Sequence, residues 1–200
     1  MLCELVASVS GTSQGITGLE FSSEDYTGLD AFDIEFKNVN FSSCRFTDCD
    51  FTKTSFHNVS FLNCSFTGCN FTDSFWKKSF MADCKADGSI FRGTILRECS
   101  FTNSSFRYAN FAEALLDKIN FTSCIFRDAS FMEVSLSKPV FEKCDFSCAE
   151  FFKTSLSGCD LSDSRIYGIV VSSSCKELKG AILDQFQTIE LARLLGVKIK

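Results

Sequence analysis

The feature that most constrains this chain is a bulky apolar residue, usually Phe, at every fifth position from Phe21 to Val171, with no change of phase. We call this residue the centre of its five-residue unit. Of the 31 centres, 19 are Phe and 5 are Leu. The residue two places before each centre is nearly always small: from Val39 to Ser164 it is only Val, Cys, Thr, Ser, Ala, Ile or Pro. The other three positions of the unit are rich in polar residues.

A period of five fits neither regular secondary structure. Five residues advance about 500° around an α-helix, so successive centres would spiral around its axis. In a flat strand they would point to opposite faces, because five is odd. The pattern is satisfied if the small residue and the centre both point inward from a short strand and the chain then turns a corner. Four corners close a square of about 20 residues, which predicts an all-β solenoid whose coils pair as parallel strands about 4.8 Å apart.

Nine of the twelve cysteines occupy the small inward position. Thr, Ser, Ala and Val fill the same position elsewhere, so we expect these cysteines to be small buried side chains. Disulfides or a metal site are the alternative interpretation, since neighbouring coils lie within disulfide reach. The nine are Cys44, Cys49, Cys64, Cys69, Cys84, Cys99, Cys124, Cys144 and Cys159.

The repeat divides the chain into three parts: a cap over residues 1–18, the solenoid over 19–173, and a cap with a dimerisation helix over 174–200. In the first part, Leu2, Leu5, Val6 and Val9 could form a capping strand or a short helix over the first coil. Such a cap is needed because an open coil end exposes unpaired backbone.

In the last part, helical spacing of apolar residues predicts a helix over about 185–195, with Asp184 at its start and Gly196 at its end. We expect a homodimer through this helix, and residues 195–200 could form a final strand that crosses to the partner. The apolar residues of the expected contact are Ile182, Phe186, Ile189, Leu191, Leu194 and Leu195.

Composition excludes several classes of function. The net charge of −5 argues against direct nucleic-acid binding. No apolar run is long enough to span a membrane, and the first 15 residues do not resemble a signal peptide, so we expect a cytoplasmic protein. The single histidine, His57, lies at an outward position. No catalytic set, metal cluster or phosphate-binding loop is recognisable, so we expect a non-enzyme without a cofactor or metal.

Residues 20 apart share a face of the solenoid, which allows outward charges to be sorted. One face, the acidic wall, carries three cations, Lys53, Arg92 and Lys153, and seven carboxylates. We expect these carboxylates to contact a partner by imitating a phosphate backbone, although a merely solubilising surface is the alternative. The next face, the basic wall, has the opposite sign. The seven carboxylates are Asp30, Asp33, Asp50, Asp73, Glu113, Glu133 and Glu150.

Outward apolar residues form a second candidate surface. Phe75, Ile95 and Leu115 share one face in three consecutive coils, and we expect Phe80 and Ile90 close by. Such a patch marks either a partner site or the seat of another segment, here the N-terminal one.

The unit small-x-[Phe/Leu]-x-x over about 19–173 resembles the pentapeptide-repeat family, whose fold is a right-handed quadrilateral β-helix. Two segments, CKADGSIFRG (84–93) and GAILDQFQTIELARLLG (180–196), resemble the Qnr quinolone-resistance branch of that family. This resemblance implies a dimeric rod that imitates DNA and binds the type II topoisomerases DNA gyrase and topoisomerase IV. The loops that interrupt the coils of many Qnr proteins have no counterpart, because the phase is unbroken from 21 to 171.

Two functions therefore follow from the sequence. The first is a DNA mimic that binds DNA gyrase or topoisomerase IV and confers quinolone resistance. The alternative is a structural or protein-interaction scaffold that uses the apolar patch and has no link to topoisomerase.

Overall fold

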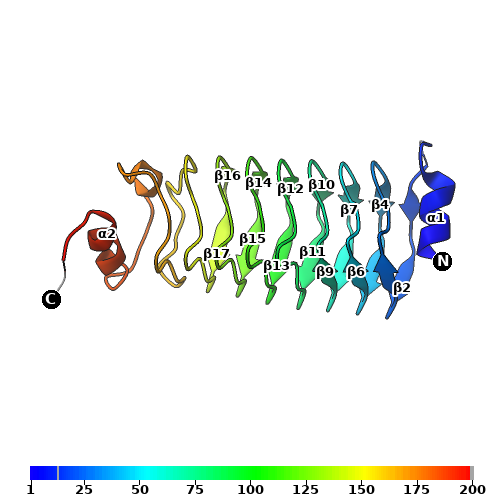
Figure 1. The fold of residues 1–200 in the computed structure, drawn as a ribbon, viewed down its shortest axis with the longest axis horizontal. Coiled ribbons are helices and arrows are strands. Elements are labelled where there is room, and N and C mark those ends of the chain that lie inside the picture. Colours follow the sequence, from blue (N-terminus) through cyan, green and yellow to red (C-terminus); the bar gives the residue numbers. More distant parts are fainter. Residues whose placement is uncertain (13, 199–200) are drawn as a thin grey trace.

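Parallel pairing at a spacing of 20 residues organises the whole chain. The structure is a computed structural model and describes residues 1–12 and 14–198. The predicted fold class is confirmed, since the chain forms a parallel β-solenoid with four walls and a short C-terminal helix (Figure 1). Two walls are seven-stranded sheets, in which each strand pairs with the strand one coil further along.

The basic wall and the wall that follows it, which we call the second wall, are these two sheets. The basic wall consists of β1 (Ile16–Thr17), β4 (Glu35–Lys37), β7 (Ser55–His57), β10 (Phe75–Lys77), β12 (Ile95–Arg97), β14 (Leu115–Asp117) and β16 (Ser135–Ser137). The second wall consists of β2 (Glu20–Ser22), β5 (Asn40–Ser42), β8 (Ser60–Leu62), β11 (Phe80–Ala82), β13 (Ser100–Thr102), β15 (Asn120–Thr122) and β17 (Val140–Glu142).

The other two walls keep the same register with less regular strands. The third wall begins as a sheet of β3 (Asp25–Thr27), β6 (Arg45–Thr47) and β9 (Ser65–Thr67) and continues as single bridges to Arg165. The acidic wall is a ladder of single bridges that runs from Asp30 to Val170.

The centres fill the axis of the solenoid, as the inward phase predicted. Under the acidic wall, Phe71, Phe91, Phe111 and Phe131 form a continuous stack, with ring centroids 4.8 Å apart at the first two steps and 5.1 Å apart at the third. Each of these side chains is at most 1% exposed. Stacking at the coil spacing lets each of these rings contact a like ring above and below it, so this part of the core is an aromatic column. Under the basic wall the column changes from Phe36, Phe56 and Trp76 to leucine from Leu96 onward.

From Val39 to Ser164 the small inward residues except Pro139 are buried, and many of the Thr, Ser and Cys side chains among them donate to a carbonyl of the coil before. The Thr54 hydroxyl, for example, donates to the Ala31 carbonyl at 2.6 Å, and the Cys84 thiol contacts the Phe61 carbonyl at 3.4 Å. All nine cysteines predicted at this position are buried, and every cysteine in the described residues is a free thiol. Burial raises the pKa of Cys124 to about 12, which keeps that thiol protonated and unreactive.

Each end of the solenoid carries its own covering segment. At the N-terminal end the predicted cap is a helix rather than a strand: α1 (Leu2–Val9) buries Leu2, Val6 and Val9. Parallel pairing starts directly after it, at β1. At the C-terminal end, the 3-10 helix η1 (Lys176–Leu178) and the bridge of Ile182 to Asp160 precede α2 (Thr188–Leu194).

The C-terminal helix is shorter than predicted. Asp184 accepts hydrogen bonds from the N–H groups of Phe186 and Gln187, both at 2.7 Å, so it caps the turn that precedes α2 rather than α2 itself. Gly196 ends the helix as predicted, with a φ of 77° and its N–H donating to the Arg193 carbonyl. Of the strand expected over 195–200, Val197 and Lys198 are not in a strand, and residues 199–200 lie outside the described part.

Candidate interaction surfaces

The structure brings all seven predicted carboxylates together on the acidic wall. They occupy two kinds of position. Asp30, Asp50 and Glu150 stand on the bridge ladder itself. The remaining four stand at the corner that follows, where the backbone is left-handed with φ between 57° and 62°: Asp33, Asp73, Glu113 and Glu133. Because every coil repeats the same corner, the carboxylates form a file along the length of the solenoid.

Ion pairs divide this file into two halves. Arg92 pairs with Glu113 at 2.7 Å, and Lys153 pairs with Glu133 at 2.7 Å. No carboxylate of the N-terminal half of the wall forms an ion pair in the part of the chain that the structure describes. The unpaired carboxylates of the wall's N-terminal half are Asp30, Asp33, Asp50 and Asp73, and one cation, Lys53, stands at the corner between Asp33 and Asp73. Sorting charges by wall did not reveal the pairs, although their spacings of 21 and 20 residues are the signal that could have done so.

The two ladder carboxylates of this half also have a local role. Asp30 accepts a hydrogen bond from the Phe32 N–H at 3.1 Å, and Asp50 accepts one from the Thr52 N–H at 2.8 Å. Asp33 and Asp73 make no hydrogen bond of this kind and are exposed. The two corner carboxylates are therefore the better positions for testing a contact, because substituting them disturbs the turns least.

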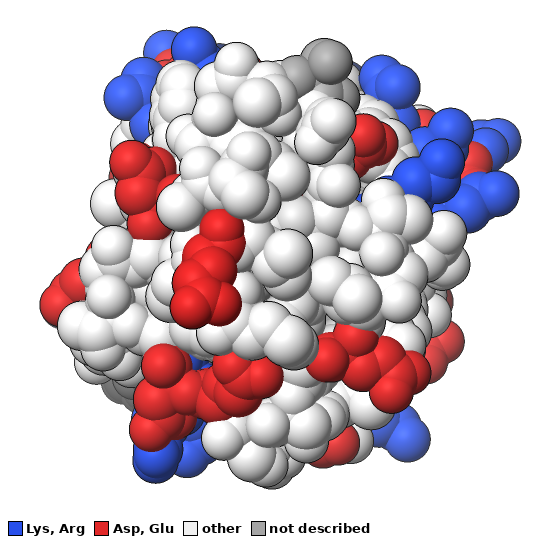
Figure 2. All heavy atoms as spheres, turned by 90° about the vertical axis from the view of Figure 1, so that its right-hand side faces the viewer, with Lys and Arg blue, Asp and Glu red and all other residues white. Residues whose placement is uncertain are grey.

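The basic wall presents the opposite charge. In the view onto the end that α1 covers, Lys and Arg side chains lie at the upper left and right and also at the two lower corners, and most of the visible Asp and Glu side chains lie over the middle and lower part (Figure 2). Lys118 lies 4.0 Å from Glu98, and the Arg97 guanidinium lies 5.8 Å from the centroid of the Phe75 ring. These contacts are exposed, so we expect each to contribute little to stability.

Three of the five predicted apolar surface residues form one continuous strip. Phe75, Ile95 and Leu115 are direct neighbours in the register of β10, β12 and β14, and each is half-buried. Phe80 lies instead on β11 of the second wall, and Ile90 lies on the acidic wall. They were expected beside the strip, but they belong to the two adjoining walls. We use "apolar strip" for Phe75, Ile95 and Leu115 alone.

The N-terminal segment does not cover the apolar strip. Helix α1 packs its apolar residues on the first coil, beside β1 and at the end of the solenoid (Figure 1). The strip is therefore not the seat of the N-terminal helix.

The only histidine sits at the edge of the strip. His57 Nε2 lies 3.8 Å from a Glu35 carboxylate oxygen, and its ring centroid lies 5.3 Å from that of Phe75. These are surface contacts, and in the described residues no group of three His, Cys, Asp or Glu side chains is placed to hold a metal ion.

The residues predicted to form a dimer contact are mostly exposed. Phe186 is 70% and Leu195 is 69% exposed, and Ile182 and Ile189 are exposed as well. Leu191 is half-buried, and Leu194 packs against the core of its own chain. The C-terminal end of the solenoid thus presents apolar side chains to its surroundings.

Gln187 anchors this end, a role that sequence reasoning missed. Its side-chain amide is buried and donates to the carbonyls of Leu161 and Ser164 at 2.7 and 2.6 Å. Its side-chain oxygen accepts from the Asp184 N–H at 2.8 Å. The signal that could have indicated this contact is a polar residue at a position where the helical spacing of the segment predicts an apolar one.

Comparison with models of known protein families identifies the family of this chain. Models described as pentapeptide repeats match residues 34–73 and 124–163, and a further pentapeptide-repeat model matches residues 86–130. The chain belongs to the pentapeptide-repeat family. Together these matches cover more than half of the chain.

Solved structures support the fold of this pentapeptide-repeat protein. A trypsin-treated form of QnrB1, described as a plasmid-mediated fluoroquinolone resistance protein, is 20% identical with a TM-score of 0.57, covering 93% of this chain and 97% of that one. Full-length QnrB1 is 21% identical with a TM-score of 0.50, covering 89% of this chain and 100% of that one. No curated protein matches the chain. No helix in residues 1–12 or 14–198 is long and apolar enough to cross a membrane.

Proposed function

We propose that this protein is a non-enzymatic mimic of DNA that binds a type II topoisomerase, DNA gyrase or topoisomerase IV, through its acidic wall. The observation that carries the proposal is the file of unpaired carboxylates on the N-terminal half of that wall. An enzyme that binds DNA presents a positive groove, which attracts a fixed file of negative charge. The fold shared with QnrB1, whose description names fluoroquinolone resistance, supports a related role.

The rigidity of the wall favours this kind of contact. Consecutive coils are about 4.8 Å apart, so the bridge ladder from Asp30 to Glu150 extends over roughly 29 Å. On this wall the bridges join successive coils without a gap from Asp30 to Val170, so little conformational entropy is lost on binding. Because Arg92 and Lys153 neutralise part of the C-terminal half, we assign the main contact to Asp30, Asp33, Asp50 and Asp73.

We further propose that the protein acts in the cytoplasm as a homodimer joined at its C-terminal ends. Exposed apolar side chains at the end of a solenoid favour association, because contact removes them from water. An end-to-end dimer would place two acidic walls on one continuous rod, about twice the length of one chain.

A supercoiling assay tests the function. We expect the protein to restore gyrase supercoiling in the presence of ciprofloxacin, and we expect Asp33→Asn with Asp73→Asn to lose most of this effect. Asn keeps the shape of Asp and tolerates the left-handed corner, so the change removes charge with little effect on the fold. If the wild-type protein leaves supercoiling unchanged with and without the drug at every ratio tested, the proposal is wrong.

A scaffold function is the second candidate, and the uncovered apolar strip favours it. A file of half-buried apolar residues on a flat sheet is suited to a protein contact rather than to DNA mimicry. Ile95→Thr with Leu115→Thr keeps the strand propensity and removes the apolar surface. If the wild-type protein binds neither topoisomerase, and this variant loses a protein contact that the Asp33 and Asp73 variant keeps, the scaffold function is favoured.

A further inference from the structure

On the basic wall, apolar side chains stand one above another in three consecutive coils. Phe75 pairs in register with Ile95, and Ile95 pairs with Leu115. The residues at the same position one coil before and one coil after the apolar strip are Ser55 and Ser135, so polar side chains bound it at both ends. Two coil steps separate the first residue of the strip from the last, which makes the strip roughly 10 Å long.

No other wall repeats this arrangement. Between residues 20 and 165, the position directly before a centre is apolar at four places outside the strip, namely Phe80, Ile90, Ile125 and Val140. Each of these four has a polar residue at the same position in both neighbouring coils. Single apolar residues are common on protein surfaces, whereas three in successive coils form a surface that a partner can cover.

The strip is packed at its base and open on its outer side. Each of its three side chains is half-buried. The centroid of the Phe75 ring lies 5.3 Å from that of His57 and 5.8 Å from the Arg97 guanidinium. Beside the strip the surface is hollowed, and Leu115, Lys77 and Arg97 are among the residues that line a groove of about 550 Å³. An apolar side chain of a partner can enter this groove.

Opposite charges flank the strip on its two sides. On one side, Lys77 and Arg97 are neighbours in register and both are exposed. Asp117 follows in the next coil, so the positive charge lies beside the first two residues of the strip. On the other side, the corner of the acidic wall places Asp73 and Glu113 next to the strip. A partner that covers the strip therefore meets positive charge on one flank and negative charge on the other.

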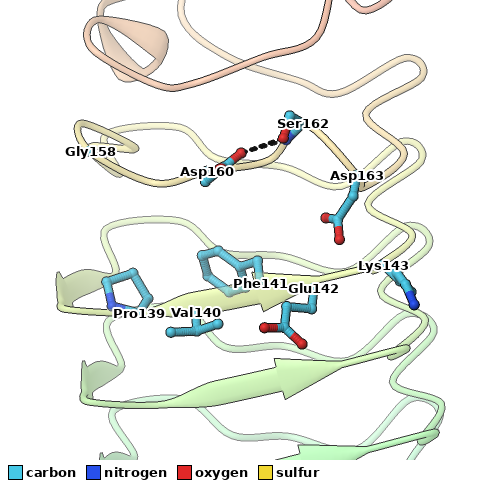
Figure 3. Close-up of a pocket in the computed structure, with 9 residues that line it drawn as sticks. All are labelled: Pro139, Val140, Phe141, Glu142, Lys143, Gly158, Asp160, Ser162 and Asp163. Carbon is cyan, nitrogen blue, oxygen red and sulfur yellow. Dashed lines mark hydrogen bonds between the residues drawn. The ribbon is translucent and has the colours of Figure 1, made fainter.

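Negative charge also gathers where the basic and second walls end. β16 and β17 are the last strands of their sheets. The groove between β17 and the coil that follows is lined by one cation, Lys143, and by three carboxylates, Glu142, Asp160 and Asp163 (Figure 3). An acidic partner is therefore better placed beside the first two residues of the strip than at the C-terminal end of these walls.

The backbone of the basic wall is already paired at the strip. β10, β12 and β14 each have a neighbouring strand on both sides, so their N–H and C=O groups are bonded within the sheet. A partner cannot add to this surface as a strand and must bind through side chains. An α-helix suits such a contact, because it satisfies its own backbone groups.

The spacing of the strip also matches a helix laid along the solenoid. Apolar residues at i, i+4 and i+7 of a helix span about 10.5 Å, close to the two coil steps of about 9.6 Å that the strip covers. Side chains on one face of an extended chain are about 6.6 Å apart, so the third would overshoot the strip by about 4 Å. A helix parallel to the solenoid axis can therefore place one apolar residue against each coil.

We propose that the apolar strip binds an amphipathic α-helix of a partner protein, laid along the solenoid axis, with acidic residues on the flank that faces Lys77 and Arg97. Residues on its other flank, beside Asp73 and Glu113, should be Lys or Arg. Because the two flanks of the strip differ in sign, the helix binds in one direction only. The proposal rests on the scaffold function proposed above, and gyrase binding through the acidic wall can fail without affecting it.

A labelled helical peptide tests the proposal by fluorescence anisotropy. Two repeats of Leu-Ala-Gln-Leu-Glu-Gln-Lys place Leu on one face, Glu on one flank and Lys on the other, and a staple on the outer face holds the helix. We expect micromolar binding to the wild-type protein. A stapled peptide of the same composition, whose Leu residues do not share a face, should bind at least about tenfold more weakly. A peptide with Lys in place of Glu should show a loss of similar size.

Two variants of the protein separate the apolar and the charged contributions. Ile95→Thr with Leu115→Thr should lower affinity at least about tenfold, whereas Ile90→Thr, at the equivalent position of the acidic wall, should leave it unchanged. Lys77→Gln with Arg97→Gln should lower affinity severalfold and reduce its dependence on salt, because it removes the charges that face the acidic flank.

A nitroxide at one end of the peptide tests the fixed direction. It should broaden amide signals at one end of the strip, around Ser55 or around Ser135, and not at both. Broadening at both ends, equal binding of the rearranged peptide, equal affinity of wild type and the Ile95 and Leu115 variant, or no binding at millimolar concentration would each overturn the proposal. The supercoiling assay tests the acidic wall separately, so failure of one proposal is distinguishable from failure of the other.

Discussion

Replacing Phe111 with Ala removes a ring from the middle of an aromatic column. The side chain is 1% exposed. Its ring centroid lies 4.8 Å from that of Phe91 and 5.1 Å from that of Phe131, and edge contacts with Phe106 and Phe126 follow at 5.8 and 5.9 Å. Truncation of a buried Phe costs about 3–5 kcal/mol, and each lost aromatic pair adds about 0.5–1.5 kcal/mol beyond its area. Because hydrogen-bonded coils above and below prevent collapse of the cavity, we expect about 5 kcal/mol.

Phe152→Ala is the matched control, since the same residue type points outward there. Phe152 is 37% exposed, and its main contact is Lys153, whose Nζ lies 5.7 Å from the ring centroid. We expect a loss below about 1 kcal/mol. Urea unfolding followed by circular dichroism gives both values, and an unchanged slope m would show that the two variants unfold as one unit. Similar losses for the two substitutions would refute the assignment of inward and outward positions.

Three further predictions concern assembly, thiol reactivity and pH. Phe186→Asp should yield a monomer by light scattering with an unchanged circular dichroism spectrum, because this ring is 70% exposed; a monomeric wild type would contradict the proposed dimer. Ellman's reagent should react rapidly with the two exposed thiols of the native protein, Cys3 and Cys148, more slowly with the half-buried Cys175, and with the nine buried thiols only after unfolding. The pKa of Asp145 is lowered, because its burial is outweighed by hydrogen bonds, the largest from Ser147. Its stabilisation is therefore present above the unfolded pKa of about 3.9 and lost as the pH falls through the lower folded value. Asp145→Asn should consequently reduce the urea midpoint at pH 7 and leave it nearly unchanged at about pH 2; equal losses at both would contradict this.

The solenoid could be predicted because its repeat is local and redundant. The inward residues can be identified within each five-residue unit alone. Phe111 and Cys124 were therefore placed in the core without knowledge of the rest of the chain. Sorting residues by multiples of 20 likewise placed Asp33 and Asp73 on one wall.

Features that depend on non-repeating contacts could not be predicted in the same way. The spacing of Leu2, Val6 and Val9 allowed either a strand or a helix, and packing on the first coil favours the helix. Phe80 and Ile90 were expected beside the apolar strip because they are near it in sequence, but each corner moves the chain to another wall.

The two seven-stranded sheets end at β16 and β17, beside Pro139, and this has a sequence signal that repeat analysis passed over. Pro139 satisfies the rule for a small inward residue, so it reads as a regular member of the pattern. What distinguishes it is the missing N–H, which the pattern of side-chain sizes does not record. A repeat should therefore be examined for its backbone donors as well as for its side chains.

Gyrase affinity at two salt concentrations tests the central claim most directly. We expect the wild-type protein to bind gyrase at micromolar concentration in low salt and more weakly as salt rises, because exposed charges are screened beyond about 10 Å at 0.1 M. Asp33→Asn with Asp73→Asn should weaken binding, whereas Lys78→Asn with Lys138→Asn, at equivalent left-handed corners of the basic wall, should not. No binding by the wild-type protein in low salt, or equal affinity of the two variants, would contradict the account.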